Sequence, residues 1–218
     1  MTAWQAEQLD ALRIVRRHLI EIKSSRREQL RASAEDYLSF RQDLDLFLAA
    51  HFSQVCTRTC YTNNRSACCG KDGIIIFFAE VVINALVSTE EALDRLMSVL
   101  VQPNAGLKCV YLGSQGCRWQ LRPAVCALFL CDPAEAEVFH SNAHLCSQWS
   151  RFKKREKKFR WPDRAVLFDD LEKTFITAGY ESPLMYCHTS PGLLRVKRSA
   201  GIGTGVSRYQ NRSGHPFR

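Results

Sequence analysis

The sequence lacks a long apolar segment, and this absence bears on where the protein works. The first thirty residues carry charges throughout and contain no apolar stretch followed by a small-residue cleavage site, so no secretory signal is visible. The longest apolar run, 74–84, is interrupted by Glu80 and falls short of the about 20 residues that a membrane-spanning helix needs. We therefore expect a cytoplasmic protein without a membrane span.

Glycine and proline are absent from residues 2–55. Apolar residues there, such as Leu12, Val15 and Leu19, recur at the spacing of one helix face. This region predicts two helices, or one long helix with a break near Ser24 and Ser25. We expect it to form an antiparallel hairpin or a brace against the rest of the chain.

Further helices are predicted downstream. Residues 73–78 favour a short extended lead-in to a buried helix through Leu86. Ser88 and Glu91 then have the spacing of a capping box, which predicts a helix that starts after Ser88 and ends by Pro103.

The second half of the chain has its own start and stop signals. Asp132, followed by proline, predicts an N-cap and a helix that runs through residue 146 and can extend to Trp161. Residues 163–178 predict a last helix with Gly179 just after its end. The chain is thus expected to be mainly α, a helical protein with an irregular cysteine-rich core and little β-structure.

The sequence has ten cysteines. In a reducing compartment dense thiols indicate metal ligation or redox chemistry and not disulfides. Eight of them form two groups, spaced C-x3-C-x7-C-C and C-x7-C-x8-C-x4-C: Cys56, Cys60, Cys68 and Cys69, then Cys109, Cys117, Cys126 and Cys131. The alternative for single members, Cys126 and Cys131 above all, is a small buried hydrophobe.

The spacing bears on the kind of metal centre. Structural zinc sites usually show pairs of C-x2-C knuckles, and none is present here. Iron–sulfur clusters accept wider and less regular spacing because they gather ligands from separate loops. The pattern therefore favours an iron–sulfur cluster, with zinc as the alternative.

The same residues resemble a known family. A C-x3-C loop with a following Cys-Cys pair, an apolar segment containing Glu80, and a cysteine-rich stretch closing on Arg122-Pro123-x-x-Cys126 are similar to the YkgJ-type cysteine-cluster family, a zinc- or iron-chelating domain. The likeness covers about residues 56–146. Flagellin lysine N-methylases are relatives of that family, so a methyltransferase-like or redox enzyme is the second hypothesis.

The resemblance implies which residues hold the metal. The ligand candidates are Cys56, Cys60, Cys68, Cys69, Cys109, Cys117 and Cys126, and Arg122 is the family's arginine. Here the first two cysteines are more widely spaced than in short members, and Cys131 is an addition. Both thiolates of the vicinal pair seldom reach one metal, so one of them is expected to lie beside the ligands. Arg122 can offset thiolate charge and tune the cofactor, or form a surface ion pair.

Histidines contribute weaker signals. His140, His144 and Cys146 form H-x3-H-x-C, and on one continuous helix the two imidazoles share a face. A solvated or core histidine is the simpler interpretation. Cys187 and His188 are isolated and are taken as non-ligands.

The charge of +8 is concentrated in two places. Residues 151–160 hold seven basic residues and one Glu, residues 182–218 hold six basic residues and no acid, and so the remainder carries −4. Trp149, Phe152, Phe159 and Trp161 lie among or beside the first group, which suggests an acidic or nucleic-acid partner. The alternative is a solvated helix face with its aromatics turned inward.

Together these patterns predict four regions. Residues 1–55 form an N-terminal helical region, 56–150 the metal-binding domain, 151–181 the basic segment and last helix, and 182–218 a basic, flexible tail. The leading hypothesis is a metal-binding protein, and a nucleic-acid-binding adaptor is the third.

Overall fold

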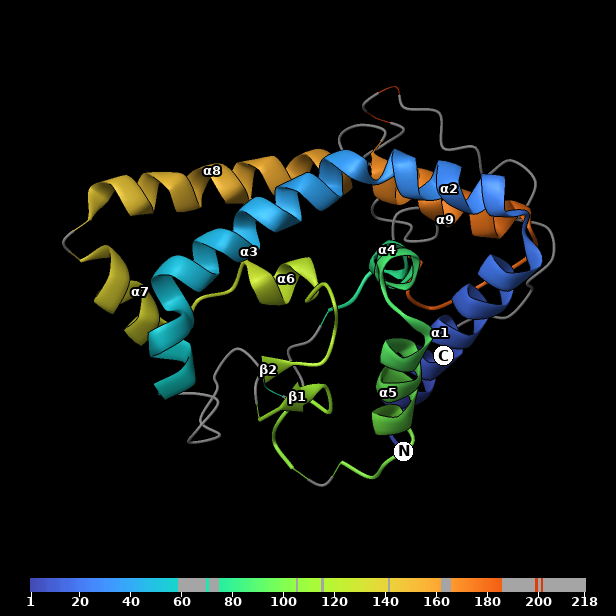
Figure 1. Ribbon diagram of the computed structural model, residues 1–218, viewed down its shortest axis with the longest axis horizontal. Coiled ribbons are helices and arrows are strands. Elements are labelled where there is room, and N and C mark those ends of the chain that lie inside the picture. The colour runs from blue at the N-terminus through green and yellow to red at the C-terminus, as the bar shows by residue number, and fades with distance from the viewer. Residues whose placement is uncertain are drawn as a thin grey trace.

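The computed structural model describes residues 1–58, 70, 75–104, 106–114, 116–140, 142–161, 166–185, 199 and 201. Over these residues the protein is mainly helical, which confirms the predicted fold class (Figure 1). The elements are α1 (Ala3–Glu21), α2 (Ser24–Ser33), α3 (Glu35–Cys56), α4 (Phe78–Val87), α5 (Glu90–Leu100), β1 (Leu112–Gly113), β2 (Gly116–Cys117), α6 (Ala124–Ala127), α7 (Asp132–Phe139), α8 (Ala143–Arg160) and α9 (Leu167–Thr177).

The N-terminal region contains three helices, and the sequence predicted at most two. Helix α1 begins at a capping box of Thr2 and Gln5 and ends where Ile22 turns extended, two residues before the expected break. A second break at Ala34 separates α2 from α3. Ala34 is completely buried, so the bend is set by packing and not by a glycine or proline.

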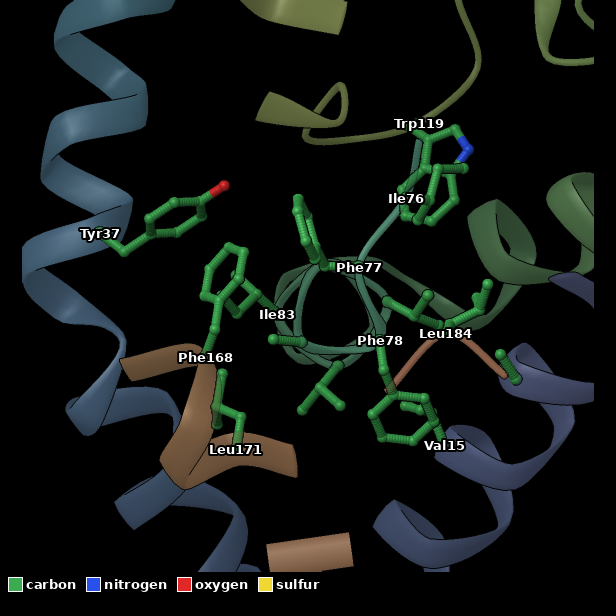
Figure 2. Packing of buried hydrophobic residues seen from close by; sticks show 14 of the residues in the cluster. Val15, Tyr37, Ile76, Phe77, Phe78, Ile83, Trp119, Phe168, Leu171 and Leu184 are labelled. Atoms are coloured by element: carbon green, nitrogen blue, oxygen red, sulfur yellow. The ribbon is translucent and has the colours of Figure 1, made fainter. Parts of the chain in front are cut away.

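Helix α4 lies at the centre of the molecule. It packs against α1, α2 and α9, and Figure 2 shows it end-on among side chains that include Val15 of α1 and Phe168 and Leu171 of α9. Seven of its residues, from Phe78 to Asn84, are buried, as expected of a helix that is apolar on all sides. Of the predicted lead-in, Phe77 is extended and precedes α4 directly, whereas residues 73 and 74 lie outside the described residues.

Two helix starts are shifted by one residue from the prediction. The N-cap of α5 is Thr89, whose hydroxyl accepts the Ala92 N–H, whereas Ser88 caps the end of α4. The N-cap of α7 is Cys131, and Asp132 is its first helical residue.

The predicted long helix after Asp132 is in fact two. Helix α7 ends at Phe139, and α8 starts afresh after Asn142, whose side chain accepts the Leu145 N–H. Helix α8 is continuous across residue 150, where the sequence predicted a boundary between two regions. It ends at Arg160 with Trp161 as its C-cap, at the predicted position.

Helix α8 lies alongside α3 (Figure 1). Phe47 stacks on Trp149 with ring centroids 6.0 Å apart, and Phe40 stacks on Phe159 at 5.5 Å. These aromatic residues of the basic segment therefore face inward.

Gly179 follows α9 with a φ of 89°, the conformation predicted for that position.

None of the helices in the described ranges is long and apolar enough to span a bilayer.

Candidate metal centre

A short hairpin carries Cys109 and Cys117. Strands β1 and β2 pair antiparallel with Leu112 opposite Cys117, and the turn needs Gly116, whose φ is 111°. The Cys109 Sγ accepts the backbone N–H of Tyr111 at 3.4 Å. Backbone N–H groups that point at a sulfur stabilise its thiolate and metal-bound forms.

Cys126 lies on α6, directly after the Arg122-Pro123 turn, and three side chains hold that turn. Glu80 Oε1 accepts the Ala124 N–H, Asn84 Oδ1 accepts the Leu121 N–H at 3.0 Å, and Arg41 donates to the Arg122 carbonyl. We call Glu80, Asn84 and Arg41 the clamp. It fixes the backbone on both sides of the Arg-Pro pair and so positions Cys126.

The clamp is buried, with exposed fractions of 4% for Glu80, 0% for Asn84 and 1% for Arg41. Burial raises the pKa of Glu80, while the N–H groups of Ala124 and Phe77 and the charge of Arg41 oppose that rise. Arg41 also donates to the Tyr37 hydroxyl at 3.2 Å. A buried carboxylate with two N–H donors and a nearby guanidinium is well compensated.

Three thiols from two chain segments act on one another electrostatically near the clamp. Burial is the largest cause that raises the pKa of Cys109 and of Cys126 to about 12, and the charge of Cys117 contributes to both increases. The charge of Cys109 also acts on Cys126. Such charge interactions require proximity. Cys109, Cys117 and Cys126 therefore lie within range of one another's charge, although not close enough together in the described structure to hold an ion.

Arg122 contributes to the same neighbourhood. Its guanidinium donates to the Ala127 carbonyl at 3.2 Å, and its charge lowers the pKa of Cys126, opposing the effect of burial. The side chain is half-buried, and its position fits a charge-offsetting role beside the thiols.

The first cysteine group is described only in part. Cys56 is the last residue of α3, half-buried and packed against the core, whereas Cys60, Cys68 and Cys69 lie outside the described residues. Gly70 forms an isolated antiparallel bridge with Lys108. In the sequence Gly70 directly follows Cys69, and Lys108 directly precedes Cys109.

The remaining candidates are on other elements or outside the described residues. Cys131 is the N-cap of α7, and its charge is not among those that act on Cys109 or Cys126. His140 is the C-cap of α7 and His144 is on α8, so the prediction that they share a helix face is wrong. Cys146 is exposed, and Cys187 and His188 are outside the described residues.

Two aromatic residues next to the hairpin, Tyr111 and Trp119, were not predicted from the sequence as part of the site. Tyr111 and Trp119 meet edge-to-face with ring centroids 5.4 Å apart, and both are buried. Burial raises the pKa of Tyr111 well above its ordinary value, the charges of Cys109 and Cys117 add to the increase, and the nearby Trp119 N–H opposes it. Within the described residues, neither the Tyr111 hydroxyl nor the Trp119 N–H has a hydrogen-bond partner.

The donor chemistry fits a thiophilic metal. Within the described ranges, however, no three His, Cys, Asp or Glu side chains are close enough together to hold an ion. Binding therefore requires a further ligand from the first cysteine group, or a contraction of the three thiols around the metal.

No protein-family model, curated protein or solved structure matches this chain.

Proposed function

We propose that this protein binds a metal centre through its two cysteine groups. The observation that supports this most is the convergence of Cys109, Cys117 and Cys126 from separate segments, with the Cys109 sulfur already accepting a backbone N–H. The bridge between Gly70 and Lys108 supports a contribution from the first group, because both residues adjoin a ligand candidate.

The bound metal supplies the positive charge that stabilises the thiolates. Buried thiols with a pKa of about 12 are protonated at neutral pH, and forming their thiolates without a cation costs free energy. A zinc ion or the iron of a cluster displaces those protons and joins segments that are distant in the sequence. Binding energy at this site is thus folding energy.

We favour an iron–sulfur cluster over zinc. The wide cysteine spacing supports it, and so do the donors around the thiols, because Arg122, Tyr111 and Trp119 can offset the negative charge of a cluster and its sulfides. Abundant thiol ligands suit a reducing compartment, so we propose a cytoplasmic location. The methyltransferase-like or redox activity stays a prediction from the family resemblance.

Matched cysteine variants test the proposal. Cys126→Ser removes a half-buried thiol, one of the three proposed ligands Cys109, Cys117 and Cys126, whereas Cys146→Ser removes an exposed thiol on α8. After anaerobic purification, we expect the first variant to lose most of its bound iron or zinc and the second to retain the wild-type amount. Equal metal contents in the two variants would exclude Cys126 as a ligand.

A further inference from the structure

The outer face of α8 carries a row of exposed cations, one of which, Lys153, also lies 5.6 Å from the ring centroid of Trp149. Five basic side chains on it are exposed, and at 100° per residue they lie within about 160° of the helix circumference, an arc without a carboxylate. No ion pair in the described part of the chain involves any of them. They are Arg151, Lys153, Lys154, Lys157 and Lys158, which we call the α8 cation row.

The other two basic residues of the segment are occupied. Arg155 pairs with Asp43 on α3, and Arg160 pairs with the buried Glu156. One end of the cation row has acidic neighbours, because Asp36 and Asp170 line a cavity of about 380 Å³ together with Lys158. The fold therefore satisfies the inner cations, partly balances Lys158, and leaves the others facing solvent.

An exposed aromatic ring ends the row. Trp161, the C-cap of α8, is 40% exposed, unlike Trp149, which is 3% exposed. The Lys157 ammonium lies 4.8 Å from its ring centroid. A cation row that ends in an accessible indole offers ionic contacts to phosphates and a flat surface to a base.

We propose that the α8 cation row and Trp161 bind single-stranded nucleic acid. The row extends about 10 Å along the helix axis, enough for two or three consecutive phosphates. An anionic membrane fits less well, because the aromatic residues of α8 pack on α3 and leave no apolar face to insert. Helix α8 is also flanked by α3 and α9, so it cannot enter the major groove of a duplex as an isolated helix can. An acidic protein would leave Trp161 without a stacking partner.

Two variants that lose the same number of charges distinguish binding by the α8 cation row from nonspecific attraction to a basic protein. The face variant changes all five residues of the α8 cation row to Gln, which has a helix propensity similar to that of Lys and Arg. The control variant changes five exposed cations elsewhere, Arg13, Arg26, Arg31, Arg95 and Lys173, to Gln. Both lose five charges and keep the basic residues of 182–218. Circular dichroism verifies that each variant is folded.

Fluorescence anisotropy of a labelled 12-nucleotide single strand, in DNA and RNA forms and over a salt series, provides the test. We expect the face variant to bind at least tenfold more weakly than the control, with a shallower dependence of log K on log salt. Trp161→Ala should weaken binding about tenfold, whereas Trp161→Phe should retain most of it.

Several results would overturn the proposal. They are equal binding by the face and control variants, no effect of Trp161→Ala, or equal competition by a duplex or by polyglutamate. Cys126→Ser should bind the strand as the wild type does, so this surface is tested independently of the metal centre.

Discussion

At the residue scale, the clamp shows how three polar side chains in an apolar core can serve a site. Glu80→Ala leaves the Phe77 and Ala124 N–H groups without an acceptor, and Asn84→Ala does the same to Leu121. We expect each change to lower the free energy of unfolding by about 2 kcal/mol, because a buried N–H without an acceptor costs this much. Chemical denaturation measures it, with the exposed Ser53→Ala as control. Changes below the control's effect would show that the clamp does not hold the turn.

Arg122 should tune the centre without holding it. Its charge lowers the pKa of Cys126, so Arg122→Ala raises that pKa and makes protons compete better with the metal. We expect an unchanged metal content at pH 8 but metal loss at a higher pH than in the wild type when the protein is acidified. For an iron–sulfur cluster, the lost positive charge should also lower the reduction potential. Acid titration followed by absorbance, and voltammetry, measure both. Complete metal loss at pH 8 would instead make Arg122 structural.

Metal uptake should release protons from the buried thiols. Cys109 and Cys126 have a pKa of about 12, raised above that of an ordinary thiol, so both are protonated at neutral pH in the metal-free protein. Each thiolate that binds metal then frees one proton, and affinity rises about tenfold per pH unit for each such ligand. We expect the affinity for Co(II) to rise at least about 100-fold per unit between pH 6.5 and 7.5, measured by competition with a chelator.

The matched comparison for proton release is Cys146→Ser, which should show the same pH dependence as the wild type. An affinity independent of pH would mean that these thiols do not bind the metal.

At the element scale, the N-cap of α5 is Thr89 in the structure and was predicted as Ser88 from the sequence. Thr89 Oγ1 accepts the Ala92 N–H, whereas the Ser88 hydroxyl makes no hydrogen bond among the described residues. We expect Thr89→Ala to lower the free energy of unfolding by about 1 kcal/mol and Ser88→Ala to change it by less than about 0.5 kcal/mol. Thermal unfolding of the two variants measures the difference, and the opposite order would restore the predicted capping box at Ser88.

The helices themselves were largely predictable, because apolar periodicity, Pro103, Trp161-Pro162 and Gly179 are local signals. The break at Ala34 was not, since it has no glycine or proline and Ala34 is fully buried. The break after Phe139 was missed although Asn142, the N-cap of α8, is a local start signal. The second break separates His140 from His144. The prediction that His140 and His144 share a helix face assumed one continuous helix and is therefore wrong.

At the scale of the whole molecule, the sequence pointed to the thiols but not to the side chains that position them. Cys109, Cys117 and Cys126 were predicted as ligands; in the structure their charges act on one another, and their role as ligands stays a prediction. The roles of Arg41 and Asn84 were missed because their partners lie 81 and 37 residues away. A polar pair at i and i+4 in an otherwise apolar helix, Glu80 and Asn84, was the available signal.

The central claim is that cysteine sulfurs from both groups bind one metal centre. X-ray absorption at the iron and zinc edges of anaerobically purified, full-length protein tests it most directly. We expect about one centre per chain and a first coordination shell of three or four sulfurs at about 2.3 Å. For the favoured iron–sulfur cluster we also expect iron neighbours beyond that shell. A shell of oxygen and nitrogen atoms, or protein without stoichiometric iron or zinc, would contradict it.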